Sequence, residues 1–131
     1  MNITLLKKIR TAILAKPKRF DMGWWIETNM GYAPCGTVAC LAGFAVLLNE
    51  TKGSTGPKAW RAAADRRAPD QDSIANEAQK ILDLNASQRT ALFAVGGWPL
   101  TFQEAYREAQ TEAQQAKAAA ARITHLIKTG K

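Results

Sequence analysis

The sequence predicts an all-α fold, a single compact domain of about five or six helices. Apolar residues recur at helical spacing near both ends of the chain, and an almost wholly apolar run occupies its middle. With 131 residues, of which 47% are hydrophobic, the chain can bury one core without disulfides or metals. We expect one helical domain over 1–131, built around a buried central helix at 38–48 and a long C-terminal helix at 102–128.

The first helix is predicted at about 3–15, where isoleucines and leucines recur three and four positions apart. Pro17 ends this pattern. The segment "FDMGWWIETNMGY" follows at 20–32, and its short apolar pieces are broken by glycine and asparagine. Either one helical turn or one short strand is consistent with it.

The central helix is predicted to begin at Thr37, whose hydroxyl is suited to an N-cap. From Val38 the chain reads "VACLAGFAVLLN", which is apolar on nearly all sides and typical of a helix buried in mid-domain. Gly43 within it costs about 1 kcal/mol relative to alanine, and a close helix crossing would explain its presence. Cys40 falls in the same run, so we expect it to be a buried, reduced and non-catalytic thiol.

Residues 49–72 are rich in glycine, proline and charge, and they predict a long basic surface loop with a short helix around 60–66. Asp72 or Ser73 is suited to cap the next helix. A further short helix is expected from about residue 85, before the sequence "GGWP" interrupts the pattern.

The last helix is predicted to start with a capping box, in which Thr101 precedes Glu104 by three residues. Its alanine-rich sequence has a strong intrinsic preference for helix. Gly130 is suited to end it.

The net charge of +7 favours an anionic partner, either a phosphate-bearing ligand or an acidic protein. We expect a cytoplasmic protein, because neither a signal peptide nor a membrane span is recognisable. We expect no cofactor and no metal, since one histidine and two cysteines spaced CxxxxC do not match a zinc site. Nothing in the sequence indicates a homo-oligomer.

The candidate ligand site combines the start of the central helix with the basic and aromatic residues upstream. Amides at a helix N-terminus bind anions when they are open to solvent, and indole rings can stack on a base. Core packing is the alternative role for the tryptophans. The predicted ligand-binding residues are Lys18, Arg19, Trp24, Trp25, Thr37, Val38, Ala39 and Cys40.

A second basic surface is predicted in the 49–72 stretch, where cations surround one tryptophan. The residues of this surface are Lys58, Trp60, Arg61, Arg66 and Arg67.

Three pieces of the chain resemble a family of small bacterial and phage-borne proteins without an established activity. They are "FDMGWW", "CGTVACLAGFA" and "LFAVGGWP" with the downstream "EAYREAQ" and "ARITHLIKTG", and the CGTxxCxAG core is the most distinctive. The resemblance extends over nearly the whole chain and implies a helical fold. It supplies no catalytic residue.

The preferred functional interpretation is a non-enzymatic binding protein that captures a nucleotide, a nucleic acid or an acidic partner. The phage occurrence of the resembling family suggests an action against a host factor or signal. One alternative is a cysteine-dependent enzyme that uses Cys35 with His125, the only histidine. Another is a protein–protein adaptor that uses the 49–72 stretch.

Overall fold

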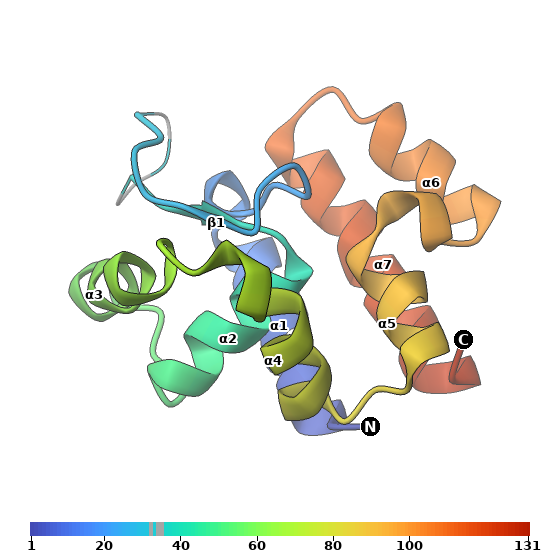
Figure 1. The fold of residues 1–131 in the computed structure, drawn as a ribbon. Coiled ribbons are helices and arrows are strands. Elements are labelled where there is room, and N and C mark those ends of the chain that lie inside the picture. The colour runs from blue at the N-terminus through green and yellow to red at the C-terminus, as the bar shows by residue number, and fades with distance from the viewer. Residues whose placement is uncertain (32, 34–35) are drawn as a thin grey trace.

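A computed structural model describes residues 1–31, 33 and 36–131 and confirms the all-α class (Figure 1). Seven α-helices are present in this part of the chain, more than the five or six expected. They are α1 (Ile3–Ala15), α2 (Leu41–Glu50), α3 (Pro57–Arg67), α4 (Ile74–Leu82), α5 (Ala86–Phe93), α6 (Leu100–Arg107) and α7 (Glu112–Thr129). The remaining elements are the 3-10 helices η1 (Pro17–Arg19), η2 (Gln71–Ser73) and η3 (Val95–Gly97) and the strands β1 (Ile26–Glu27) and β2 (Val38–Ala39).

Helix α2 forms the centre of the fold, and every residue from Leu41 to Leu48 is buried. Its neighbours are α1, α3, α4 and α5. An apolar helix surrounded in this way removes hydrophobic surface from water on all its sides, as the composition of this segment predicts.

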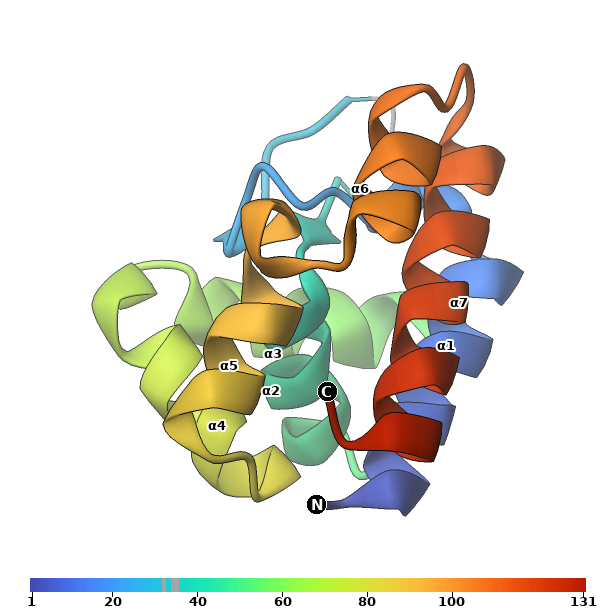
Figure 2. The ribbon, with the colours of Figure 1, turned by 90° about the vertical axis from the view of Figure 1, so that its right-hand side faces the viewer.

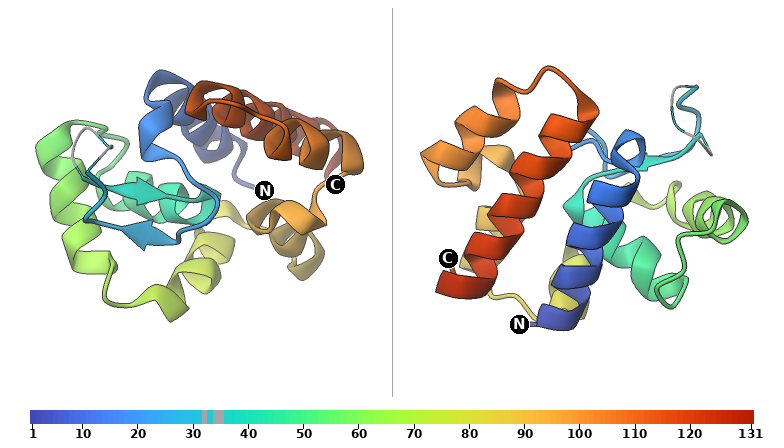
Figure 3. Two further views of the ribbon diagram at one scale, coloured as in Figure 1. Left: turned by 90° about the horizontal axis from the view of Figure 1, so that it is seen from above. Right: turned by 180° about the vertical axis from the view of Figure 1, so that it is seen from behind.

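Helices α1 and α7 lie side by side and run antiparallel, forming a layer behind α2 (Figure 3, right). Asn2 caps α1 by accepting a hydrogen bond from the amide of Leu5. Helix α6 turns back and packs along α7 (Figure 2). None of the helices in the described ranges is both long and apolar enough to cross a membrane.

The aromatic segment contains the strand β1, which settles the alternative left open by the sequence. It pairs antiparallel with β2, with Ile26 opposite Ala39 and Glu27 opposite Val38. On its other edge, the side chain of Gln71 donates to the carbonyl of Ile26 and accepts from the amide of the same residue. The carboxamide thus occupies the place of a third strand.

The predicted start of the central helix at Thr37 is wrong. Val38 and Ala39 belong to β2, and Cys40, which has extended backbone angles, is the N-cap of α2. The strand prevails because the backbone of residues 38–40 finds partners in the aromatic segment, including a 2.7 Å bond from the Cys40 amide to the Trp24 carbonyl.

The long C-terminal helix is present as α7, but its predicted start at residue 102 is wrong, because α6 and α7 are separate. The capping box at Thr101 is absent, and Pro99 occupies the N-cap of α6. The hydroxyl of Thr111 caps α7 by accepting from the amide of Gln114. This break allows α6 to reverse and place Tyr106 against the core. Gly130 ends α7 with a φ of 72°, as predicted.

The short helix expected around 60–66 is present as α3, but it is longer than predicted and leaves less of the 49–72 stretch as a loop. Pro57 starts α3, whose eleven residues include four alanines, so helix propensity outweighs the flanking glycines and prolines. Trp60 is fully buried and lies 5.0 Å from Phe44 between ring centroids. Helix α3 is therefore anchored to the centre of the fold.

Candidate anion-binding site

The amides that were predicted to bind an anion do not form an open cradle. Thr37, Val38 and Ala39 have no exposed surface, and Cys40 is 2% exposed. The Cys40 amide already donates to Trp24. Because the helix starts three residues after its predicted beginning and deep in the core, its N-terminal amides are not available to a ligand in solution.

The thiol of Cys40 is buried, as predicted. Its Sγ lies 3.9 Å from the carbonyl oxygen of Trp25, to which it donates. Burial raises the pKa of the thiol to about 11, although the amides of Gly43 and Ala42 oppose this shift. The group is therefore protonated at neutral pH and is a poor nucleophile.

Cys35, the thiol of the enzyme alternative, lies outside the described residues. The Nδ1 atom of His125 is 3.3 Å from a guanidinium nitrogen of Arg122, and its ring centroid is 5.2 Å from that of Phe102. Since an arginine can only donate, Nδ1 acts as the acceptor. The imidazole thus has neighbours on α6 and α7. No group of three or more potential metal-binding side chains exists among the described residues.

Arg19 is a core residue, whereas Lys18 beside it is exposed. The Arg19 guanidinium lies 5.5 Å from the centroid of the Trp60 ring, and its Nη1 donates to the Thr55 carbonyl at 2.7 Å. The role of Arg19 is therefore to fix the segment before α3, and it is not on the surface for a ligand.

Trp24 and Trp25 are 44% and 39% exposed, so the core-packing alternative is wrong for both. The carbonyl of Trp24 accepts a hydrogen bond from the amide of Cys40, and that of Trp25 accepts one from the Cys40 thiol. These bonds hold the backbone of the two residues, and the indoles face solvent.

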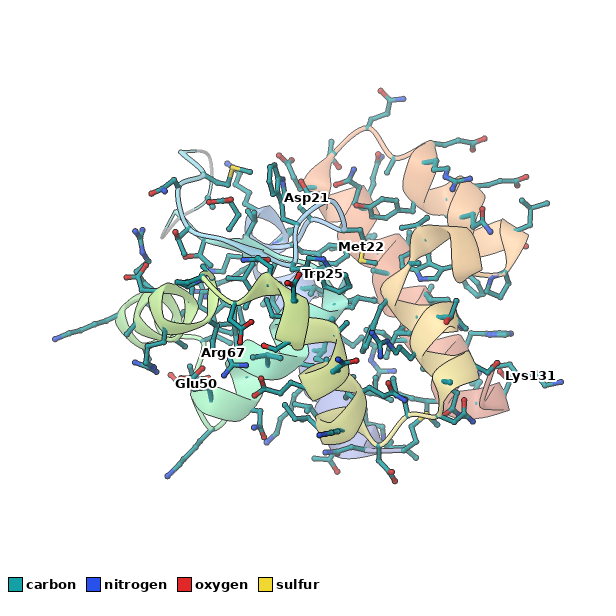
Figure 4. All side chains as sticks on the ribbon, in the orientation of Figure 1. Asp21, Met22, Trp25, Glu50, Arg67 and Lys131 are labelled. Carbon is teal, nitrogen blue, oxygen red and sulfur yellow. The ribbon has the colours of Figure 1, made fainter. Side chains whose placement is uncertain are left out.

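The predicted second basic surface is mostly neutralised by ion pairs. Arg61 pairs with Asp65, Arg66 with Glu50, and Arg67 with Glu77. Figure 4 labels Glu50 of α2 and Arg67 of α3, which belong to two of these pairs. Trp60 of this set is buried, as described above, and Lys58 is exposed without an ion pair among the described residues.

A groove that the sequence analysis did not identify lies between α1 and the turn after α2. Its volume is about 590 Å³. Ammonium groups stand on both walls, and its floor is apolar. The described residues that line it are Thr4, Lys7, Lys8, Thr11, Ala12, Ala15, Leu48, Lys52, Gly53 and Thr55, and none of these is acidic.

The turn that carries Lys52 is a Schellman motif. The amide of Gly53 donates to the Leu48 carbonyl at 2.8 Å, and that of Lys52 to the Asn49 carbonyl at 3.3 Å. Lys52 has a φ of 56°, at the position where glycine is usual. The motif directs a lysine into the groove at a position that local backbone preference would give to glycine.

Basic residues are concentrated on the layer formed by α1, η1 and α7. Residues 1–19 and 113–131 contain ten of the eighteen lysines and arginines and none of the eleven acidic residues. Two of the ten, Arg19 and Arg122, are buried. The other eight form what we call the basic face, and they are Lys7, Lys8, Arg10, Lys16, Lys18, Lys117, Lys128 and Lys131.

The geometry places much of the basic face on one side of the molecule. Arg10 donates to the hydroxyl of Thr124 at 2.9 Å, across the junction of α1 and α7. Helical spacing puts Lys7 on the same side of α1 as Arg10, and Lys117 and Lys128 on the same side of α7 as Thr124. No ion pair within the described part of the chain includes a member of the basic face.

Comparison with protein-family models, curated protein sequences and solved structures gives no significant match. The assignment of a function therefore depends on the geometry of this chain.

Proposed function

We propose that the chain is a non-enzymatic protein that binds the phosphate backbone of a nucleic acid through the basic face. The observation that supports the proposal is the segregation of charge, with ten basic and no acidic residues in the two packed terminal segments. Phosphate contacts from lysine and arginine provide most of the affinity in sequence-independent binding.

The extent of the basic face favours a polymer over a single nucleotide. Helix α7 has 18 residues and is about 27 Å long. Each strand of a DNA duplex has one phosphate about every 3.4 Å of the duplex axis, so a duplex aligned with α7 presents roughly eight phosphates of each strand over this length, and those on the near side can meet the basic face. None of the described residues that line the groove is aromatic and able to stack on a base, which favours contacts with phosphates over contacts with bases. Lys7 belongs to both the groove and the basic face, so the groove would seat part of the same backbone.

The test is fluorescence anisotropy of a labelled DNA duplex of about 20 base pairs, titrated at about 50 mM and about 200 mM salt. We expect saturable binding that weakens strongly at the higher salt concentration. Reversing two charges of the basic face, with Lys7→Glu and Lys128→Glu together, should weaken binding about tenfold or more. It should also lower the salt slope by about two, because each phosphate contact releases a counterion.

The matched control reverses two exposed lysines elsewhere, with Lys58→Glu and Lys80→Glu together, and changes the net charge equally. We expect the control to bind within about threefold of the unchanged protein, because the contacts themselves are preserved. An equal loss in both double variants would mean that only net charge matters, and the proposal would fail. Absence of binding at the lower salt concentration would also reject it.

A further inference from the structure

We propose a second interaction site on the segment that leads into β1, a docking surface for an arginine-bearing segment of a partner protein. It consists of Trp24, Trp25, Asp21, Glu27 and the groove beside Asp21, and we call it the acidic-aromatic patch. The inference does not depend on nucleic acid binding. Its central feature is two exposed tryptophans whose backbone is held by hydrogen bonds from Cys40.

The backbone beneath the indoles is fixed by the start of α2. The amide of Cys40 donates to the Trp24 carbonyl at 2.7 Å, and the Cys40 thiol donates to that of Trp25. A Cβ at Gly43 would overlap the Trp25 carbonyl oxygen and approach Ile26 within 3.1 Å. Ile26 therefore faces α2, and the alternation of a strand turns Glu27 to the outer side. Trp25, which precedes β1, is 39% exposed. Figure 4 shows Asp21, Met22 and Trp25 on the segment that passes above α2.

Exposed tryptophans on a rigid backbone are well suited to protein recognition. They bury a large area on binding and lose few rotamers, and tryptophan is enriched among the residues that dominate interface energies. The indoles of Trp24 and Trp25 are 44% and 39% exposed, so each offers part of this area.

The chain segments that contain and flank the tryptophans are acidic. Residues 20–50 and 68–79 contain six of the eleven acidic residues and none of the eighteen basic ones. The two segments meet at β1, because Gln71 binds the edge of Ile26 and stands between Asp70 and Asp72. The local field therefore favours a cationic partner, the opposite of the preference of the basic face.

A groove beside Asp21, three residues before Trp24 in the chain, is suited to a cationic side chain. It has a volume of about 230 Å³ and lies between Asp21 and the turn that joins α6 to α7. The described residues that line it are Phe20, Asp21, Ala109, Gln110, Thr111, Glu112 and Gln115. Its two charged groups are the carboxylates of Asp21 and Glu112. The backbone of Asp21 is joined to that of Trp24, whose amide lies 3.4 Å from the Asp21 carbonyl oxygen.

Arginine is the cation that matches both parts of the patch. A guanidinium stacks on an indole face and donates to carboxylates in a fixed, fork-like geometry, whereas an ammonium is a more strongly hydrated point charge. The peptide segment would place one guanidinium between Asp21 and Glu112 and pack its neighbours on Trp24 and Trp25.

The probe is a fluorescein-labelled peptide of alternating glycine and arginine, compared with peptides in which lysine or glutamate replaces arginine. We expect saturable binding of the arginine peptide, weaker binding of the lysine peptide, and none of the glutamate peptide. Trp24→Ala and Trp25→Ala should each weaken binding about fivefold or more. Asp21→Asn should do the same without affecting folding, because the amide oxygen can still accept from Gly23 as the carboxylate does at 2.8 Å.

Two controls locate the effect. Leu100→Ala removes another exposed apolar side chain, 66% exposed, and Asp83→Asn removes an exposed carboxylate elsewhere; both should leave binding unchanged. Circular dichroism verifies the fold of each variant. If a tryptophan variant unfolds, the affinity of the Asp21→Asn protein for the arginine peptide decides the test. The proposal is overturned if the arginine peptide does not bind at low salt. It also fails if the glutamate peptide binds equally well, or if folded Trp24→Ala, Trp25→Ala and Asp21→Asn proteins bind as the unchanged protein does.

Discussion

Gly43 of α2 lies directly against the carbonyl oxygen of Trp25, so closely that a side chain at residue 43 would overlap it. The absent Cβ is what allows β1 to cross the first turn of the helix. This glycine does not serve the close helix crossing expected from the sequence, because its neighbours are the backbone and side chain at the start of β1 and the Ala39 side chain. This contact also positions the acidic-aromatic patch, because it fixes the backbone of its tryptophans.

Gly43→Ala is expected to destabilise the protein by about 2 kcal/mol or more. The added methyl group would have to displace the backbone of β1, and overpacking of this kind typically costs 1–3 kcal/mol. Helix propensity alone would favour alanine by about 1 kcal/mol, so the sign of the effect distinguishes the two influences. Urea unfolding monitored by circular dichroism measures it.

The control for this substitution is Gly96→Ala, where an added Cβ would meet no atom within 4 Å. Its free energy of unfolding should stay within about 0.5 kcal/mol of the unchanged protein. A stabilising effect of Gly43→Ala would show that β1 does not approach α2 as described.

Cys40 is expected to make stability depend on pH in the alkaline range. Its folded-state pKa is about 11, against 9.0 for an unperturbed thiol. Above pH 9 the unfolded chain releases this proton and the folded protein keeps it, so stability present below pH 9 declines as the pH rises toward 11. The full loss from this group is about 2–3 kcal/mol.

The measurement compares Cys35→Ser with the double variant Cys35→Ser/Cys40→Ala, so that other titrating groups cancel. The difference in unfolding free energy between the two should shrink by about 2–3 kcal/mol from pH 8 to pH 11. In the Cys35→Ser protein, a thiol reagent should modify Cys40 only as fast as the protein opens. Rapid modification at neutral pH would contradict the buried, protonated thiol.

The helical class and the first helix could be predicted because both follow from local periodicity, and Pro17 marks a boundary that the backbone must respect. The start of α2 could not be predicted from local periodicity. Val38 and Ala39 are compatible with either a helix or a strand, and the choice depends on Ile26 and Glu27, which are distant in sequence. A two-residue strand carries too little pattern to be recognised alone.

The anion-binding site predicted from the sequence is wrong for a related reason. Arg19 and Lys18 carry the same charge, yet Arg19 is buried against Trp60. Only the tertiary structure brings Arg19 and Trp60 together. The basic face, in contrast, is indicated by a charge pattern in the sequence. The first 19 residues and the last 19 contain no acidic residue, a pattern visible without a structure. Their adjacency requires the packing of α1 on α7.

Lys52→Gly is expected to raise stability and weaken anion binding together. The left-handed conformation of Lys52 is one that glycine adopts freely, so the free energy of unfolding should rise by up to about 1 kcal/mol. The same change removes an ammonium group from the groove, and DNA should bind about twofold to fivefold more weakly.

The comparison for Lys52→Gly is Lys58→Gly in α3, which should lose about 0.5–1 kcal/mol of stability because its backbone is helical. Its effect on DNA binding should be small. Unchanged affinity of Lys52→Gly would exclude the groove from the binding surface while leaving the rest of the basic face under test.

Arg19→Ala is expected to destabilise the protein by about 2–4 kcal/mol, because it removes a large buried side chain and the bond to Thr55. Arg19→Met should cost less than half as much. The Nε and Nη2 atoms of Arg19 are buried and have no hydrogen-bond partner among the described residues, so an apolar side chain of similar length avoids their desolvation and keeps the contact with Trp60. Thermal and urea unfolding measure the stabilities of the two variants and the unchanged protein. If the Arg19→Met protein were less stable than the Arg19→Ala protein, the buried charge itself would stabilise the fold.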